Sequence, residues 1–372
     1  MATPAATPRH RRATIHALRV SRVEAITNDA VVLEFEVPDA LAEEYDFVQG
    51  QHVSLRSADA GDDIRRSYSI CTAAGSGRLR VAVKCLPGGA FSVYARDRLR
   101  PGDSVEVVTP TGHFNTPLDP ARARVYTMIA AGSGIAPILS NIATVLEREP
   151  LSTVSLIYGN RTVDDIMFLE ELEDLKNVHT ERFMLYNVLS REEQEFALFH
   201  GRIDRERLVF FFDTLLPPAR VDEWFLCGPR AMIETARALL VERGVDVAHV
   251  HAELFHTDSI ESARSRTAVE GTATTAPAGV AADVTIILDG RRSTFTMDRE
   301  RDRVLDAALR VRSDAPYACK GGVCGTCRAK LVEGAVTMEQ CYALEQSEVD
   351  AGFVLACQSH PTTDRVVLDF DQ

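Results

Sequence analysis

Four cysteines near the end of the chain have a spacing that could hold an iron-sulfur cluster. Cys319, Cys324 and Cys327 form a C-x4-C-x2-C run, and Cys357 follows at a distance. This is the ligand spacing of a plant-type 2Fe-2S cluster. Glycines in the same loop adopt positive φ at no steric cost, which lets the backbone turn tightly around sulfide and direct N–H groups at sulfur. The spacing therefore predicts a carrier of single electrons.

Zinc and disulfide bonds fit these cysteines less well. Zinc also takes four cysteines, but usually as two closely spaced pairs, whereas here three ligands cluster and the fourth is distant. A zinc-bound structural protein stays a rival interpretation. Cys71, Cys85 and Cys341 have no ligand spacing, and in a long chain without a secretory signal they are expected to be buried or surface thiols in a reducing compartment.

A polar run at residues 66–69 has the chemistry to hold a flavin. Arg66 can neutralise a diphosphate, Tyr68 can lie on the isoalloxazine ring, and the Ser69 hydroxyl can bond a flavin nitrogen. An R-x-Y-S run alone is more often an ordinary strand with polar surface residues.

A glycine pair follows one expected strand later. Gly88 and Gly89 allow backbone N–H groups to approach a phosphate, and Ser92 adds a hydroxyl near an expected helix start. Because both runs lie in order within one β-rich region, they together predict a flavin site.

A second glycine turn indicates a nucleotide site. Gly132 and Gly134 follow an apolar strand, and Pro137 lies in the first turn of the next expected helix, whose dipole can hold a diphosphate. The run is not the G-x-G-x-x-G fingerprint, and a glycine turn needed only for packing is the alternative. Cys227-Gly228-Pro229 ends a later strand, where it would place a thiol beside a nicotinamide or merely end the strand.

Arginines indicate which nucleotide is bound. Arg161 follows the second strand, where an acidic side chain usually meets the ribose 2′-hydroxyl, and Ser190 and Arg191 follow the next strand. Guanidinium groups there favour a 2′-phosphate, and therefore NADPH over NADH. Solvated loop arginines without nucleotide preference are the alternative.

The elements that would position these residues fall into three domains. Residues 1–17 form a basic lead-in, expected to be disordered. Short apolar runs separated by Gly/Asp/Pro turns over residues 18–120 predict an antiparallel β-barrel, which would hold the flavin. Strand and helix patterns alternate over residues 121–255, which predicts an α/β domain with a parallel sheet.

The remaining chain is a linker and a third domain. Residues 256–281 are rich in Ser, Thr, Ala and Gly, which predicts a flexible linker. Residues 282–372 carry the four cysteines and begin with two strand patterns around Asp289-Gly290, a hairpin signal.

Composition limits the partners. The chain has 372 residues, 45% of them hydrophobic, and a formal net charge of -13. That charge argues against nucleic acid and anionic membranes, and favours partners with basic surface. No apolar run approaches the roughly 18 residues of a membrane helix, and the start lacks the apolar core of a secretory signal, so we expect a cytoplasmic protein.

These motifs, in this order, resemble the ferredoxin-NADP reductase superfamily fused to a C-terminal plant-type ferredoxin, over about residues 19–371. The resemblance implies FAD as the flavin and a β-grasp fold for the last domain. It also matches Glu253 to the H-x-E-x-F segment near the flavin, and it assigns Ser69, Cys227 and Glu253 to positioning and electrostatics there. Plant-type members end with an aromatic residue that shields the flavin, whereas this chain continues beyond Phe255.

A finer similarity concerns four segments. Residues 158–162, 200–204, 315–324 and 366–371 resemble the reductase components of the multicomponent phenylacetyl-CoA epoxidases of phenylacetate degradation, with reductases of 3-ketosteroid 9α-hydroxylases as the alternative. The resemblance implies that electrons pass from NADPH through FAD and the 2Fe-2S cluster to an oxygenase, here a di-iron one. A redox-sensing iron-sulfur module without turnover is the rival from another class.

Overall fold

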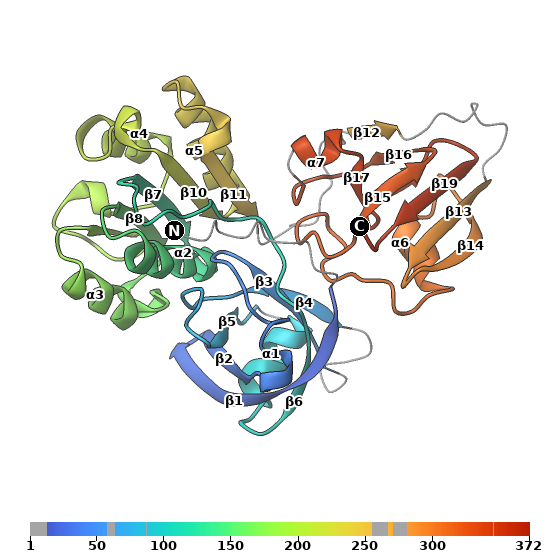
Figure 1. Cartoon of the computed structure of the whole chain (residues 1–372). Coiled ribbons are helices and arrows are strands. Elements are labelled where there is room, and N and C mark those ends of the chain that lie inside the picture. The colour runs from blue at the N-terminus through green and yellow to red at the C-terminus, as the bar shows by residue number, and fades with distance from the viewer. Residues whose placement is uncertain (1–12, 58–63, 87, 255–266, 271–280, 345) are drawn as a thin grey trace. The chain divides into compact units, whose positions relative to one another are not determined.

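The computed structural model describes residues 13–57, 64–86, 88–254, 267–270, 281–344 and 346–372. The chain divides into two compact units (Figure 1). His16–Asp258 form the first unit, and Ser259–Gln372 belong to the second.

An antiparallel six-stranded barrel begins the first unit. Its strands have the order β4-β3-β6-β1-β2-β5, and a bridge between Ile70 and Val81 joins the two ends of this order. Closure of this kind leaves no exposed sheet edge. The elements are β1 (Ile15–Thr27), β2 (Ala30–Glu36), β3 (His52–Arg56), β4 (Arg65–Ser69), β5 (Leu79–Lys84), α1 (Ala90–Asp97) and β6 (Ser104–Val108).

A parallel five-stranded sheet with the order β11-β10-β7-β8-β9 follows. The strand order reverses between β7 and β10, and this switch point is where open α/β sheets bind ligands. The strands are β7 (Val125–Ala131), β8 (Thr153–Asn160), β9 (Phe183–Leu189), β10 (Glu223–Gly228) and β11 (Val250–Leu254). The helices are α2 (Ile135–Arg148), α3 (Leu169–Val178), α4 (Arg205–Thr214) and α5 (Arg230–Glu242).

Barrel and sheet share a core because β2 is buried on both faces. Successive strand residues point to opposite faces, so Val31 and Leu33 pack inside the barrel while Ala30 and Val32 join the apolar cluster of α2. The barrel and the parallel sheet therefore pack together within one compact unit.

Polar side chains of α2 fix its place on the barrel. The Ser140 hydroxyl donates to the Thr72 carbonyl at 2.7 Å, and the Asn141 amide donates to the Phe114 carbonyl at 3.1 Å. Gly50 has φ +75°, and a Cβ there would collide with that same Phe114 carbonyl. The start of α2, and with it the glycine turn, is thus held at a fixed place beside the barrel.

The second unit has a mixed five-stranded sheet with the order β14-β13-β19-β15-β17, in which β13 and β19 run parallel. Asp289 and Gly290 join β13 to β14 with φ near +61° and +65°, the left-handed pair of a type I′ hairpin. The elements are β13 (Ala281–Leu288), β14 (Arg291–Asp298), α6 (Val304–Leu309), β15 (Arg328–Glu333), α7 (Gln346–Asp350), β17 (Phe353–Leu355) and β19 (Arg365–Asp369). A smaller sheet contains β12 (Thr267–Glu270), β16 (Ala335–Met338) and β18 (Ser359–Pro361).

The predicted fold class is confirmed: an antiparallel barrel, a Rossmann-like α/β sheet and a ferredoxin-like α+β unit. Two boundaries differ in detail. Strand β1 already begins at Ile15, within the expected lead-in, of which residues 1–12 lie outside the described residues. Most of the expected linker also lies outside them, but Thr267–Glu270 pair with β16. Within the described residues, no helix is both long and apolar enough to cross a membrane.

Candidate functional site

The four predicted cluster ligands lie in two loops of the second unit, with Cys319, Cys324 and Cys327 before β15 and Cys357 between β17 and β18. Cys324, Cys327 and Cys357 are buried, and Cys319 is half-buried. A hydrogen bond with the Cys319 thiol, followed by burial, raises the pKa of Cys324 well above its usual range. Hydrogen bonding to Cys319 lowers the pKa of Cys357, but contact with Cys327 and burial outweigh it and raise that pKa. The thiols are therefore close enough to interact with one another.

The loop backbone fits a cluster. Lys320, Gly322 and Gly325 all have positive φ, and a Cβ at Gly322 would lie 3.1 Å from the Gln340 carbonyl oxygen. The Gly321 N–H donates to the Cys319 sulfur at 3.3 Å, the kind of backbone contact that tunes iron-sulfur centres. Thiols are the ligands that hold iron in 2Fe-2S clusters, and binding of iron by these cysteines would displace their protons.

The R-x-Y-S run lies on barrel strand β4. Alternation along this strand exposes Arg66 and buries Ser69, while Tyr68 is half-buried. The Tyr68 ring lies 5.5 Å from the Phe91 ring of α1 at an angle of 38°. Burial raises the pKa of Tyr68, with Arg66 opposing, so the phenol stays neutral. A neutral aromatic ring held by a second ring can serve as a platform for a flat flavin.

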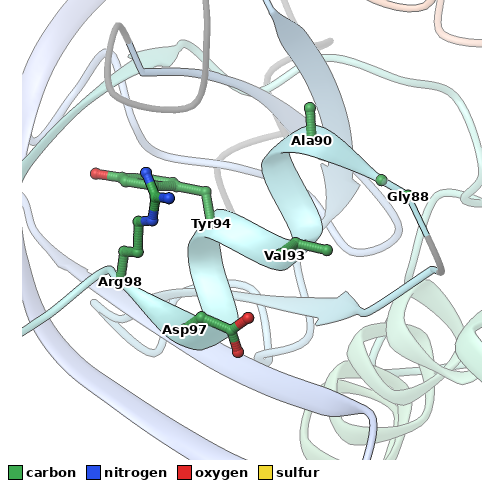
Figure 2. Close-up of a pocket in the computed structure, with 7 residues that line it drawn as sticks. Gly88, Ala90, Val93, Tyr94, Asp97 and Arg98 are labelled. Carbon is green, nitrogen blue, oxygen red and sulfur yellow. The ribbon is translucent and has the colours of Figure 1, made fainter.

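The glycine pair lies at the start of α1. Gly88 has φ +75° with open space around it, and Gly89 caps the helix. The Ser92 hydroxyl accepts from the Leu86 N–H at 3.3 Å and donates to the Gly89 carbonyl at 3.3 Å. Ser92 thus closes the turn and holds the glycine N–H groups in place, instead of offering its hydroxyl outward. A pocket beside α1 is lined by Gly88, Gly89, Ala90, Val93, Tyr94, Asp97 and Arg98 (Figure 2).

The nucleotide loop lies at the switch point of the parallel sheet. Gly132 has φ +54° with open space around it, and the Tyr158 hydroxyl donates to its carbonyl at 3.0 Å. A Cβ at Gly134 would collide with the Cys227 carbonyl, so only glycine lets the end of β7 approach the end of β10 this closely. The turn leads directly into α2 and Pro137, which is buried in the first helical turn. The fold thus places Cys227-Gly228-Pro229 against the nucleotide loop.

Ser69, Cys227 and Glu253, the three residues expected near the flavin, are connected through His52. Cys227 pairs with Glu253 across β10 and β11, and Ser69 pairs with His52 across β4 and β3. His52 Nδ1 lies 3.9 Å from the Glu253 carboxylate, which joins the two strand pairs. Burial, and then the charge of Glu253, raises the pKa of Cys227 well above its usual range. The Cys227 thiol is therefore neutral, which suits positioning rather than nucleophilic attack.

Sequence reasoning missed His52. The available signal was a histidine at the start of the expected strand His52-Val53-Ser54-Leu55, but only the fold pairs that strand with residues 66–69.

The predicted 2′-phosphate residues differ in their surroundings. Arg161 forms ion pairs with Asp165 and, at 3.0 Å, with Asp29. The Ser190 hydroxyl donates to the Asn160 carbonyl, and the side chain of Arg191 is exposed. Arg161 is thus engaged by carboxylates, whereas Arg191 presents its side chain to solvent.

Family models assign all three domains. An oxidoreductase FAD-binding domain matches residues 17–116, an oxidoreductase NAD-binding domain matches residues 128–238, and a 2Fe-2S iron-sulfur cluster binding domain matches residues 286–362. The chain is also 43% identical to one of the subunits of 1,2-phenylacetyl-CoA epoxidase from Escherichia coli (strain K12), over 96% of this chain and 98% of that protein. This chain belongs to the family of oxygenase reductases.

This oxygenase reductase is also similar to two other reductases. It is 31% identical to the ferredoxin reductase component of 3-ketosteroid-9-alpha-monooxygenase from Rhodococcus rhodochrous, over 95% of this chain and 96% of that one. Phthalate dioxygenase reductase shares the fold, with TM-score 0.56, 23% identity, and coverage of 95% of this chain and 98% of that one. The predicted family, enzyme class and transfer of electrons through FAD and 2Fe-2S to an oxygenase are confirmed.

Proposed function

We propose that this oxygenase reductase oxidises NADPH and supplies electrons to a multisubunit, di-iron phenylacetyl-CoA epoxidase. The observation that carries the proposal is the 43% identity to the epoxidase component of Escherichia coli, against 31% to the Rhodococcus ketosteroid reductase, at nearly equal coverage of this chain. Both relatives match nearly the whole chain. Coverage therefore does not distinguish an epoxidase partner from a ketosteroid monooxygenase partner, and the choice rests on sequence identity.

In this proposal the barrel holds FAD. Arg66 neutralises the diphosphate from the exposed face of β4, Tyr68 supports the ring, and Ser69 bonds it from the buried end of the strand. The N–H groups of Gly88 and Gly89 meet the diphosphate at the start of α1, in a turn fixed by the Ser92 hydroxyl. Bound FAD supplies the conversion of a two-electron hydride into single electrons.

The parallel sheet holds the nucleotide. Gly132 and Gly134 bring the start of α2 to the diphosphate, and Pro137 lies in the first turn of that helix. Residues 227–229 border the nicotinamide at the end of β10, where the neutral Cys227 thiol and the Glu253 carboxylate orient the ring without covalent chemistry. In the second unit Cys319, Cys324, Cys327 and Cys357 hold the 2Fe-2S cluster.

The preference for NADPH rests on Arg191 and Ser190. The exposed guanidinium of Arg191 can bind a 2′-phosphate in bidentate geometry. Arg161 can join it only by leaving Asp29 and Asp165, so its gain from the phosphate is reduced by the two ion pairs that it loses.

Recovery of the partner tests this proposal. The tagged chain is used to purify its partner from a native lysate of the source organism, with the tag alone as control. The recovered oxygenase is then assayed for NADPH consumption that depends on phenylacetyl-CoA. Recovery of a di-iron epoxidase with substrate-dependent turnover supports the proposal. A Rieske-type oxygenase that responds to a steroid would overturn it in favour of the alternative.

A further inference from the structure

His52 is a buried imidazole at the boundary between barrel and parallel sheet. It is 4% exposed, and it opens strand β3 directly opposite Ser69 of the predicted flavin strand. None of the motifs that predicted the cofactors includes it.

The barrel holds the His52 ring in one place. Its backbone N–H donates to the Thr111 carbonyl at 2.8 Å, and the Thr111 N–H donates back at 2.9 Å. Gly112 has φ +122°, and a Cβ there would lie 3.0 Å from the His52 Nδ1 atom. A larger residue at position 112 would therefore crowd the ring, so the loop after β6 is shaped around the imidazole.

The charged group that faces His52 comes from the other half of the unit. The Glu253 carboxylate, on β11, lies 3.9 Å from Nδ1, and the two side chains are 6% and 15% exposed. At this separation the contact is longer than a direct hydrogen bond. The attraction between the polar imidazole and the carboxylate is screened little in a site this buried. Glu253 in turn pairs with Cys227 across β10 and β11.

We infer that His52 is a positioning residue for hydride transfer, which holds the Glu253 carboxylate beside Cys227. The backbone of His52 pairs with Ser69 on β4, the predicted flavin strand. Its side chain attracts Glu253 on β11, next to the proposed nicotinamide site. His52 thereby sets the approach of nicotinamide to flavin, where small displacements have large effects on rate. The inference rests on the proposed use of NADPH at this site.

The test is a double-mutant cycle with His52→Leu, Glu253→Gln and the double variant. Rapid-mixing kinetics measure the limiting rate of flavin reduction at saturating NADPH, and titration measures the dissociation constant of NADP⁺. We expect each single variant to slow reduction about tenfold at a nearly unchanged dissociation constant, and the double variant to be no slower than the slower single variant. Denaturant unfolding of the FAD-free proteins gives a readout that needs no turnover, and it should show coupling between the two positions of about threefold or more in the unfolding equilibrium.

A matched control and a conservative variant complete the design. His16 forms a similar pair with Glu44 at 3.0 Å within the barrel, so His16→Leu should leave the rate of flavin reduction unchanged. His52→Asn keeps an N–H donor near the Nδ1 position and should restore most of the rate of flavin reduction. If His52→Leu does not fold, the rate of His52→Asn still tests the role of His52. The inference would be overturned if the reductions in rate of the two single variants multiplied in the double variant. It would also be overturned if the unfolding equilibrium showed no coupling between positions 52 and 253. If the wild type prefers NADH, the proposed nucleotide is wrong, and the same cycle run with NADH still tests His52.

Discussion

Arg161 of the parallel-sheet half forms an ion pair with Asp29 of the barrel, with its Nη2 atom 3.0 Å from the Asp29 carboxylate. Asp29 lies in the turn between β1 and β2, where it also approaches Lys84 Nζ at 3.5 Å. Arg161 follows β8, next to the position at which a nucleotide ribose is expected. One guanidinium therefore connects the two halves of the first unit and lies beside the proposed nucleotide site.

This pair separates the roles of two arginines. Arg191→Gln should weaken NADPH binding about tenfold while changing NADH binding little, because an exposed guanidinium gives up little else to reach a 2′-phosphate. Arg161→Gln should change the ratio of NADPH to NADH affinity less, because this side chain already pairs with two carboxylates. Titration of both variants with both nucleotides measures the ratio. Equal losses for the two nucleotides in Arg191→Gln would contradict the assignment.

The same network gives a pH dependence. Burial acts to raise the pKa of Asp165, but hydrogen bonds from Arg161 and Thr162 outweigh it, so the pKa lies below its usual 3.8. A lowered pKa stabilises the fold above about pH 4, and this contribution is lost as the pH falls through the lowered value. Arg161 is 45% exposed, so the contribution is small, at most about 1 kcal/mol.

Urea unfolding of the wild type and of Asp165→Asn measures this contribution. The free energy of unfolding should differ between them by the same amount at about pH 7 and about pH 5, and the difference should shrink below about pH 4. A difference that stays constant into the acid range would show that Asp165 is not ionised by this network.

The Cys227 thiol should be unreactive in the folded protein. Burial, and then the Glu253 charge, raises its pKa well above the usual value, and the thiolate is the reactive form. Mass spectrometry after treatment with iodoacetamide should therefore find Cys227 alkylated slowly in the folded protein and rapidly after unfolding. Cys85, which is half-buried, provides an internal comparison. Rapid alkylation of Cys227 in the folded state would point to an activated thiol and against a positioning role.

The approach of β7 to β10 should depend on Gly134. Gly134→Ala places a Cβ against the Cys227 carbonyl, and we expect a loss of stability of about 1–3 kcal/mol together with weaker nucleotide binding. Gly132→Ala is the matched control, because open space surrounds that position and only its positive φ is strained, at a cost of about 1 kcal/mol. If thermal unfolding shows equal effects for both variants, steric contact with Cys227 does not explain Gly134.

The sequence predicted local features of this protein best. The cysteine spacing, the hairpin at Asp289-Gly290 and the glycine turn before α2 depend on residues close in the chain, whose backbone preferences act directly. Short strand patterns predicted the barrel and alternating strand and helix patterns predicted the parallel sheet, whereas the fold of the last domain was expected from the resemblance.

Contacts between distant segments were not predictable in the same way. His52 and Glu253 are far apart in the chain, and only the packing of the barrel against the parallel-sheet half brings them together. From the sequence, Arg161 was expected to bind a phosphate. The sequence does not show that Asp29, which belongs to the barrel and is distant in the chain, pairs with it. The pairing of Thr267–Glu270 with β16 was hidden by a composition typical of linkers.

The central claim is that electrons enter from NADPH and reach a 2Fe-2S cluster held by Cys319, Cys324, Cys327 and Cys357 in the same chain. The most direct measurement is electron paramagnetic resonance of anaerobically purified protein after addition of NADPH. We expect the signal of a reduced 2Fe-2S cluster in the wild type, and its loss in Cys324→Ser. Protein that contains no iron or acid-labile sulfide, and that shows no signal even with dithionite, would show that these cysteines do not hold such a cluster.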